Sequence, residues 1–130
     1  MKILNNENLI VDSRGFIQDL ASETQINTVT QIFSHANSIR ANHYHKLTEQ
    51  YNYVAKGSLI LAVRDNINSP ITYTNFKEGD FFLIEKNEHH AIRFLDESLL
   101  LVMTIGPRGG KDYETDTYRL DTAPLFIADK

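Results

Sequence analysis

Three histidines in this sequence could share one site. His43 and His45 are separated by a single residue, and His90 lies in a later segment beside His89. Side chains two residues apart on a β-strand project from the same face, so the imidazoles of His43 and His45 can point toward one place. Imidazole is a common ligand of divalent transition metals and readily accepts a proton near neutral pH. The pattern predicts a metal centre or a proton-transfer base, and one nitrogen lone pair cannot serve both.

The segments around these histidines have the pattern of short strands. Runs of β-branched and aromatic residues recur about every ten residues and are separated by Gly, Asn, Asp or Pro, which is typical of a sandwich or barrel. No window has the periodicity of a long amphipathic helix. The sequence therefore predicts an all-β domain. The expected strands span residues 26–34, 50–56, 58–65, 71–76, 80–85, 90–95 and 99–105.

Three further segments complete the expected organisation. Residues 99–105 are almost continuously apolar, which predicts a central strand covered on both faces. Residues 8–20 predict a hairpin that turns at Ser13–Gly15, and residues 125–128 predict a short strand near the end. We expect one domain of residues 1–130, with an N-terminal segment of about 1–25, a barrel core of about 26–105 and an extended tail from 106 to 130.

The composition narrows the class of protein. The chain has 130 residues, no cysteine and a formal net charge of -4 at pH 7. Disulfide and thiolate chemistry are therefore excluded, and general nucleic-acid binding is disfavoured because it depends on clustered basic residues. No apolar run reaches the length of a signal peptide or a membrane span. We expect a soluble cytoplasmic protein with no membrane partner.

The first histidine pair resembles the first motif of the cupin superfamily. That motif places two histidines around one residue, then a carboxylate after a short gap, and a glycine after six further residues. His43, His45, Gln50 and Gly57 follow this spacing, with a neutral amide in the position of the carboxylate. Glu49 lies one residue earlier and should face the opposite side of the strand.

The second cupin motif has a counterpart later in the chain. Gly79, Glu85, Asn87 and His90 occupy the positions of its glycine, proline, second glycine and histidine. Asn tolerates the left-handed backbone that a glycine would supply. The resemblance implies a single cupin-type barrel, also called a double-stranded β-helix or jelly roll. It also implies a divalent transition metal (Zn, Fe, Mn, Ni or Cu) with the ligands His43, His45, Gln50 and His90.

A second resemblance concerns the deoxysugar epimerases and ketoisomerases that act on nucleoside-diphosphate sugars, which are also cupin-type barrels. Residues 12–16 are similar to their "D-x-R-G-F" opening. Arg40, His43 and Tyr44 match the Arg, His and Tyr of the "R-G-L-H-Y-Q" signature of the dTDP-4-dehydrorhamnose 3,5-epimerase branch, whereas Ala41 replaces its glycine and His45 its glutamine.

This resemblance implies a function in nucleotide-sugar and cell-surface polysaccharide metabolism. His43 would remove a proton next to a sugar ketone, and Tyr51 and Tyr53 are the candidates for the acid on the other face, with Tyr53 preferred. A metal at the same place would instead polarise the ketone. The expected ligand is a nucleoside-diphosphate sugar, and the expected assembly is a homodimer in which terminal segments are exchanged.

Arginines are the expected contacts of the diphosphate, because guanidinium groups bind phosphate in a forked geometry. The candidates for substrate binding are Arg14, Arg40, Arg64 and Arg93. Arg108 and Lys111 in the tail are weaker candidates for the same role.

Two other functions fit the same residues. A three-histidine metal site also suits a metal-dependent oxygenase, which would consume oxygen with a small organic substrate. The neutral Gln50 also suits a sensor of sugars or metals that has lost turnover.

Overall fold

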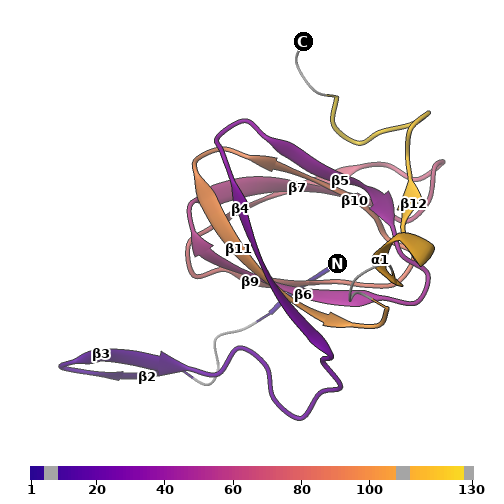
Figure 1. The fold of residues 1–130 in the computed structure, drawn as a ribbon. Coiled ribbons are helices and arrows are strands. Elements are labelled where there is room, and N and C mark those ends of the chain that lie inside the picture. The colour runs from indigo at the N-terminus through magenta and orange to yellow at the C-terminus, as the bar shows by residue number, and fades with distance from the viewer. Residues whose placement is uncertain (5–8, 108–111, 128–130) are drawn as a thin grey trace.

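The computed structural model describes residues 1–4, 9–107 and 112–127, which form two five-stranded antiparallel sheets packed face to face (Figure 1). The first sheet has the strand order β1 (Lys2–Ile3), β9 (Phe81–Ile84), β6 (Glu49–Lys56), β11 (Ser98–Ile105) and β4 (Thr28–Ser34). The second sheet has the order β12 (Tyr118–Arg119), β5 (Ile39–Tyr44), β10 (His89–Phe94), β7 (Ser58–Arg64) and β8 (Thr72–Lys77). The all-β jelly-roll barrel expected from the sequence is confirmed.

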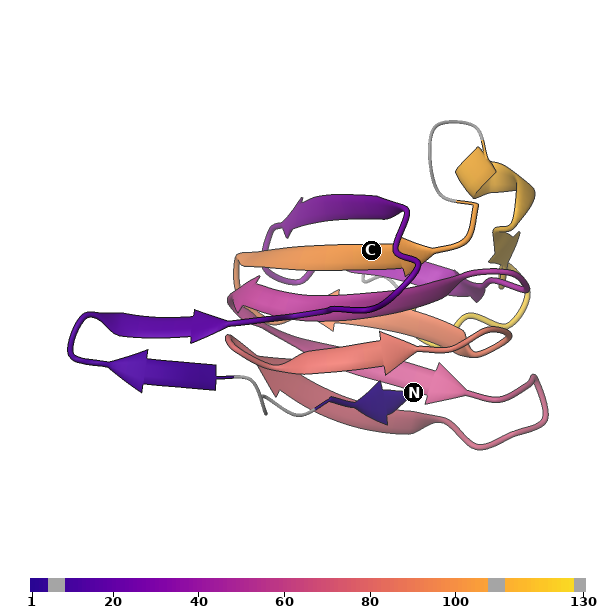
Figure 2. The same cartoon turned by 90° about the horizontal axis from the view of Figure 1, so that it is seen from below.

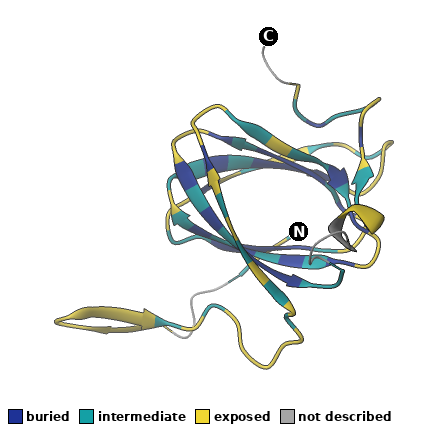
Figure 3. Cartoon of the chain, viewed as in Figure 1, coloured by how far each residue is buried: buried dark blue, intermediate teal, exposed yellow. Residues whose placement is uncertain are grey.

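The core lies between the two sheets because successive side chains of a strand alternate between its faces. Along β6, Gln50, Asn52 and Val54 are buried, while the residues between them are only half-buried. Figure 3 shows the buried positions along both sheets, with the exposed ones concentrated in the loops and outer strands. The residues of the central apolar cluster are Val54, Leu59, Leu61, Val63, Phe76, Phe82, Ile84, Ile92, Phe94, Leu100 and Val102.

The turn between β6 and β7 depends on a glycine. Gly57 has a φ of 90° and lies against the β10–β11 turn. A Cβ atom built on Gly57 would lie 2.5 Å from the carbonyl oxygen of Glu97 and 2.8 Å from the Cα of Ser98. Both the backbone conformation and the lack of space therefore require glycine here.

A bulge in β5 changes which residues face the interior. Ala41 and Asn42 have φ angles of 71° and 55°, and the pairing of β10 with β5 shifts register so that His90 opposes His43 while Ala91 opposes Ala41. Arg40 and His43 are three residues apart and would face opposite sides of a regular strand. Because of the bulge, both line the same cavity.

The N-terminal hairpin extends away from the barrel (Figures 1 and 2). It consists of β2 (Leu9–Asp12) and β3 (Gly15–Gln18), with the turn at the predicted position. Five of its apolar side chains are exposed: Leu9, Ile10, Val11, Phe16 and Ile17.

The C-terminal segment returns to the second sheet. It contains α1 (Asp112–Thr115), the one helix among the described residues, and β12, which pairs with β5. The side chain of Asn42 accepts hydrogen bonds from the amides of Leu125 and Phe126 at 2.8 and 3.2 Å and donates one to the carbonyl of Phe126 at 3.0 Å. The strand predicted at 125–128 is wrong over 125–127, because these amides bond to a side chain in place of a neighbouring strand. Among the described residues, no helix is long and apolar enough to cross a membrane.

Candidate active site

The three histidines singled out from the sequence form a buried cluster inside the barrel. His43 lies near the end of β5, His45 follows that strand, and His90 lies on the neighbouring β10. Their exposed fractions are 8%, 3% and 2%. The ring centroid of His43 is 4.6 Å from that of His45 and 4.7 Å from that of His90. One nitrogen from each ring lies within 4.8 Å of the other two, which is the arrangement expected of three ligands to one ion.

Hydrogen bonds fix the tautomers of two of these rings. His45 Nδ1 lies 2.9 Å from the carbonyl oxygen of Asp116, and His90 Nδ1 lies 3.0 Å from that of Glu88. A carbonyl oxygen can only accept a hydrogen bond, so both neutral rings carry their proton on Nδ1. In each ring the lone pair is therefore on Nε2.

His90 stays uncharged over the physiological pH range. Its burial disfavours the imidazolium and lowers its pKa to about 3, although the hydrogen bond to the Glu88 carbonyl acts in the opposite direction. The neighbouring His45 adds to the lowering. His90 is consequently available as a neutral ligand or hydrogen-bonding group, and it is a poor proton donor near neutral pH.

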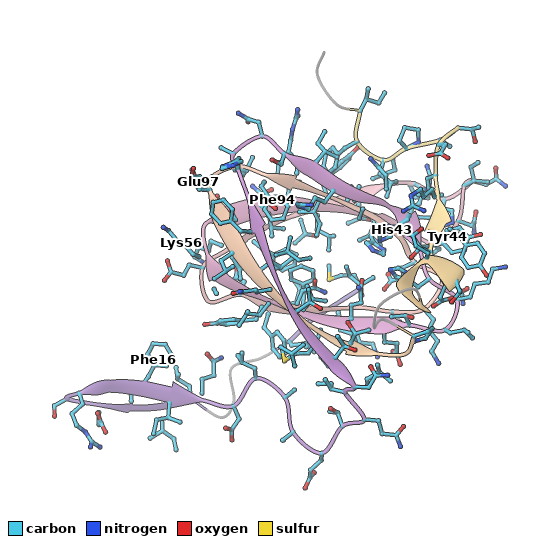
Figure 4. All side chains as sticks on the ribbon, viewed as in Figure 1. Phe16, His43, Tyr44, Lys56, Phe94 and Glu97 are labelled. Carbon is cyan, nitrogen blue, oxygen red and sulfur yellow. The ribbon has the colours of Figure 1, made fainter. Side chains whose placement is uncertain are left out.

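A cavity of about 320 Å³ opens beside the cluster, between the two sheets. Its polar lining consists of Arg40, His43, Gln50, Asn52 and His90, whose types suit an oxygen-rich ligand. The apolar side chains of the same cavity are Ile32, Ile84, Ile92, Phe94, Leu100 and Val102. Figure 4 shows His43 and Phe94 directed into the barrel, whereas Tyr44 points outward. The volume and the mixed lining are those of a small-molecule site.

Arg40 is held at the border of this cavity by the first sheet. Its Nε donates to Ser34 Oγ at 2.7 Å, and its Nη2 donates to the carbonyl oxygen of Phe33 at 3.1 Å. Both partners belong to β4, so the guanidinium connects the two sheets where they are not paired by backbone hydrogen bonds. The positive charge is thereby placed beside the polar lining of the cavity.

The amide predicted as a ligand also faces the cavity. Gln50 is 8% exposed and lines the same cavity as His43 and His90, from the facing sheet, while Glu49 is half-buried and does not line it. Strand alternation explains the difference between these adjacent residues.

The structure does not bring Tyr53 to the site. Tyr53 is three residues from Gln50 on a regular strand, so it faces the outer side of the first sheet, where its ring contacts Phe81 at a centroid distance of 6.3 Å. Tyr53 is thus absent from the residues that line the cavity, and its role as a catalytic acid stays a prediction.

Three of the four predicted substrate arginines also lie elsewhere. Arg14 is on the exposed hairpin, where its Nη2 lies 2.8 Å from Asp12 Oδ2. Arg64 faces the outer side of β7 and donates to His89 Nδ1 at 3.1 Å and to the carbonyl of Ala123 at 2.7 Å. Arg93 is three residues from His90 along β10 and lies on the outer face. The expected tail contacts, Arg108 and Lys111, lie outside the described residues.

The sequence analysis missed two polar groups of the site. Asn52 lines the cavity and could have been found, because it is two residues from Gln50 on the same strand. Asp116 is 2% exposed and contacts both His45 and the turn that follows it. Burial alone would raise the pKa of Asp116, but hydrogen bonds from Thr48, Leu47 and Lys46 lower it below its ordinary value.

The donor set fits a divalent transition metal. Three imidazoles converge, and two of them are oriented by carbonyl oxygens in the way that metal-binding histidines usually are. Gln50, which lines the adjoining cavity from the facing sheet, offers an amide oxygen. All four are nitrogen or neutral oxygen donors, which suits Zn, Fe, Mn, Ni or Cu rather than Ca or Mg.

The fold and the histidine cluster define a cupin-type jelly-roll barrel. No protein-family model matches the chain, and no curated protein matches it in sequence. Solved structures do match. The dTDP-4-dehydrorhamnose 3,5-epimerase from Sulfolobus tokodaii superposes with a TM-score of 0.74 at 16% identity, covering 94% of this chain and 78% of that one.

Two ketoisomerases extend the comparison. The TDP-quinovose 3,4-ketoisomerase from Campylobacter jejuni superposes with a TM-score of 0.70 at 27% identity, covering 95% of this chain and 90% of that one. A 3,4-ketoisomerase from Helicobacter canadensis has a TM-score of 0.70 at 24% identity, with 98% and 90% covered. The resemblance to cupin-type epimerases and ketoisomerases, inferred from the motifs, is thus confirmed as a structural likeness over most of the chain.

Proposed function

We propose that this protein epimerises or isomerises a keto-deoxysugar nucleotide by proton transfer next to a carbonyl group. The observation that carries the proposal is the single cavity lined by His43, His90 and Arg40 from the second sheet and by Gln50 from the first. The 27% identity to a TDP-quinovose 3,4-ketoisomerase over 95% of the chain supports the same class of reaction. A related 3,4-ketoisomerase at 19% identity was solved with TDP-4-keto-6-deoxyglucose, which suggests a first substrate to test.

In this proposal His43 is the base. Its imidazole removes the proton from the carbon next to the ketone, and the electrons of the broken C–H bond form the double bond of an enediolate. Return of a proton to the opposite face of that carbon gives an epimer. Return to the neighbouring carbon, with the ketone shifted to the first one, gives an isomer. The Gln50 amide and the Arg40 guanidinium are the charge-stabilising groups for the enediolate and the diphosphate, respectively.

A divalent transition metal is the alternative use of the same cluster. His43, His45, His90 and Gln50 would hold it, and when bound it would act as a Lewis acid on the sugar ketone. His43 would then be a ligand and could not be the base.

Two measurements test these roles. Incubation with TDP-4-keto-6-deoxyglucose in D₂O should incorporate deuterium next to the ketone, and His43→Asn should lower the rate by about 10²–10⁴-fold. His35→Asn, a histidine exposed on the surface, is the matched control. Elemental analysis of the wild type and of the His43→Ala, His45→Ala double variant tests the metal, and equal metal content in both would contradict it.

The convergence of three histidine nitrogens also favours a second candidate, the metal-dependent oxygenase. It requires redox-active iron or copper and consumption of O₂ with a small organic substrate. Stabilisation of the fold by TDP-sugars without turnover and without oxygen uptake would instead support a sensor.

We also propose that the chain forms a homodimer through the outer face of the first sheet. Tyr51, Tyr53, Leu83, Leu101 and Met103 lie on that face by strand register. At the β4 edge, Val29 and Phe33 are 68% and 51% exposed. Residues 99–105 are apolar on both faces of β11. The sheet interior accounts for one face, and a partner that covers the outer face would account for the other.

A second copy is the partner that fits, because the same chain also carries the exposed apolar hairpin β2–β3, which is too small to be stable alone in water. A two-fold arrangement would cover both surfaces at once. Light scattering after size-exclusion chromatography should give a dimer, and Val29→Lys should give a folded monomer. Ile67→Lys, on an exposed loop, is the control, and a monomeric wild type at micromolar concentration would refute the proposal.

A further inference from the structure

The turn that follows His45 is held by a residue of the C-terminal segment. Asp116 comes directly after α1, and its carboxylate accepts hydrogen bonds from the amide of Lys46 at 3.1 Å, from the amide of Leu47 at 3.2 and 3.1 Å, and from the hydroxyl of Thr48 at 2.6 Å. Asp116 is 2% exposed, so its carboxylate has little water to bind in place of these donors. Breaking any of these hydrogen bonds would leave a charged oxygen without a partner, which costs free energy and keeps the carboxylate in place.

The same residue contacts His45 directly. The backbone carbonyl oxygen of Asp116 lies 2.9 Å from His45 Nδ1. His45 is beyond the last residue of β5, where the sheet no longer fixes the direction of the chain. Asp116 therefore holds the ring of His45 with its backbone and the following turn with its side chain.

We propose that Asp116 is a positioning residue for His45. It keeps the imidazole proton on Nδ1, so that Nε2 presents its lone pair to the cluster of His43 and His90. The consequence for chemistry rests on the proposed function, since both proton transfer and metal binding need the lone pairs of this cluster. The tautomer itself exists with or without substrate. The C-terminal segment thereby gains a role that its sequence did not reveal.

A purely structural role for Asp116 would look different. If Asp116 only stabilised the turn, its loss would lower the free energy of unfolding and leave the proton of His45 on Nδ1. A positioning role predicts a change in the tautomer itself. His90 is an internal reference, because its Nδ1 bonds to the backbone carbonyl of Glu88, two residues earlier in the chain, and this bond does not involve Asp116.

The tautomers can be read from long-range ¹H–¹⁵N spectra of the ¹⁵N-labelled full chain at neutral pH, with chelator present. In the wild type, His45 and His90 should both show a protonated Nδ1 and an unprotonated Nε2. Asp116→Ala keeps the backbone carbonyl of residue 116 but loses the side-chain hydrogen bonds that fix its place beside His45. His45 should therefore become a mixture of both tautomers while His90 stays unchanged. Glu114→Gln, which removes an exposed carboxylate of the same segment paired with Arg119, should leave both as in the wild type.

Two results would overturn the proposal: a wild-type His45 with its proton on Nε2, or an Asp116→Ala protein in which His45 keeps its proton on Nδ1. The first needs no variant. If Asp116→Ala does not fold, Thr48→Val removes one donor to the carboxylate and should shift the His45 tautomer in the same direction by less; no shift would count against the proposal.

Zn²⁺ titration separates this proposal from the proposed function. If the cluster binds metal, Asp116→Ala should weaken Zn²⁺ binding by about 10–100-fold, as loss of a group that orients a ligand usually does. A wild type that binds no Zn²⁺ contradicts the metal alternative, while the tautomer result still decides the role of Asp116.

Discussion

Lowering the pH from 7 to 5 should destabilise the fold through His90 in particular. In the unfolded chain its imidazole titrates near 6.5, whereas burial lowers the folded-state pKa to about 3. Below pH 6.5 the imidazole of the unfolded state therefore binds a proton, whereas that of the folded state does not. The free energy of unfolding falls as the pH falls, and this loss continues until about pH 3. Integrating the difference in bound protons gives a loss of about 2 kcal/mol between pH 7 and pH 5 from this one group.

The assay is urea unfolding of the metal-free protein, with chelator, at both pH values. On going from pH 7 to pH 5, the free energy of unfolding should fall by about 2 kcal/mol more in the wild type than in His90→Gln, because the variant has no imidazole at position 90 to protonate when it unfolds. His35→Gln keeps His90 and should keep the wild-type difference. Equal pH dependence in the wild type and in His90→Gln would refute the reasoning, since it would mean that His90 is not held neutral by burial.

Three further substitutions test backbone positions of the barrel. Gly57→Ala should lower the unfolding free energy by more than about 2 kcal/mol in urea denaturation, because its Cβ would meet the backbone near Glu97; an unchanged midpoint would contradict the close approach. Ala41→Gly should raise it by about 0.5–1 kcal/mol by relieving a φ of 71°, measured in the same way, and any destabilisation would count against strain. Asn42→Ala should lower the free energy of unfolding by about 1–3 kcal/mol and speed amide hydrogen exchange at Leu125. Unchanged exchange would show that the Asn42 side chain does not protect this amide.

The strands and the histidine cluster could be predicted because their signals are local. The two-residue period of a strand and the pairing of His43 with His45 can both be read within a few positions. The same rule places Tyr53 and Arg93 on the outer faces of their sheets, because each is three residues from an inward-facing Gln50 or His90.

Other features depend on contacts between distant segments. Arg40 and His43 share the cavity only because the strand bulges at Ala41, and the sequence hint was merely that Ala41 occupies a motif glycine. Asp116 lies 71 positions from His45, and nothing near either residue indicates their contact. Such pairings follow from tertiary packing, which no local pattern encodes.

The dependence of His45 on Asp116 also sets an order of events during folding. Contacts over such a sequence distance carry a loop-closure cost and form late, and a chain growing from its N-terminus reaches Asp116 only after every strand through β11 has been made. The barrel can close before His45 is oriented. A newly made protein would therefore pass through a state with an intact core and an unfinished site, and binding competence would be the last property it acquires.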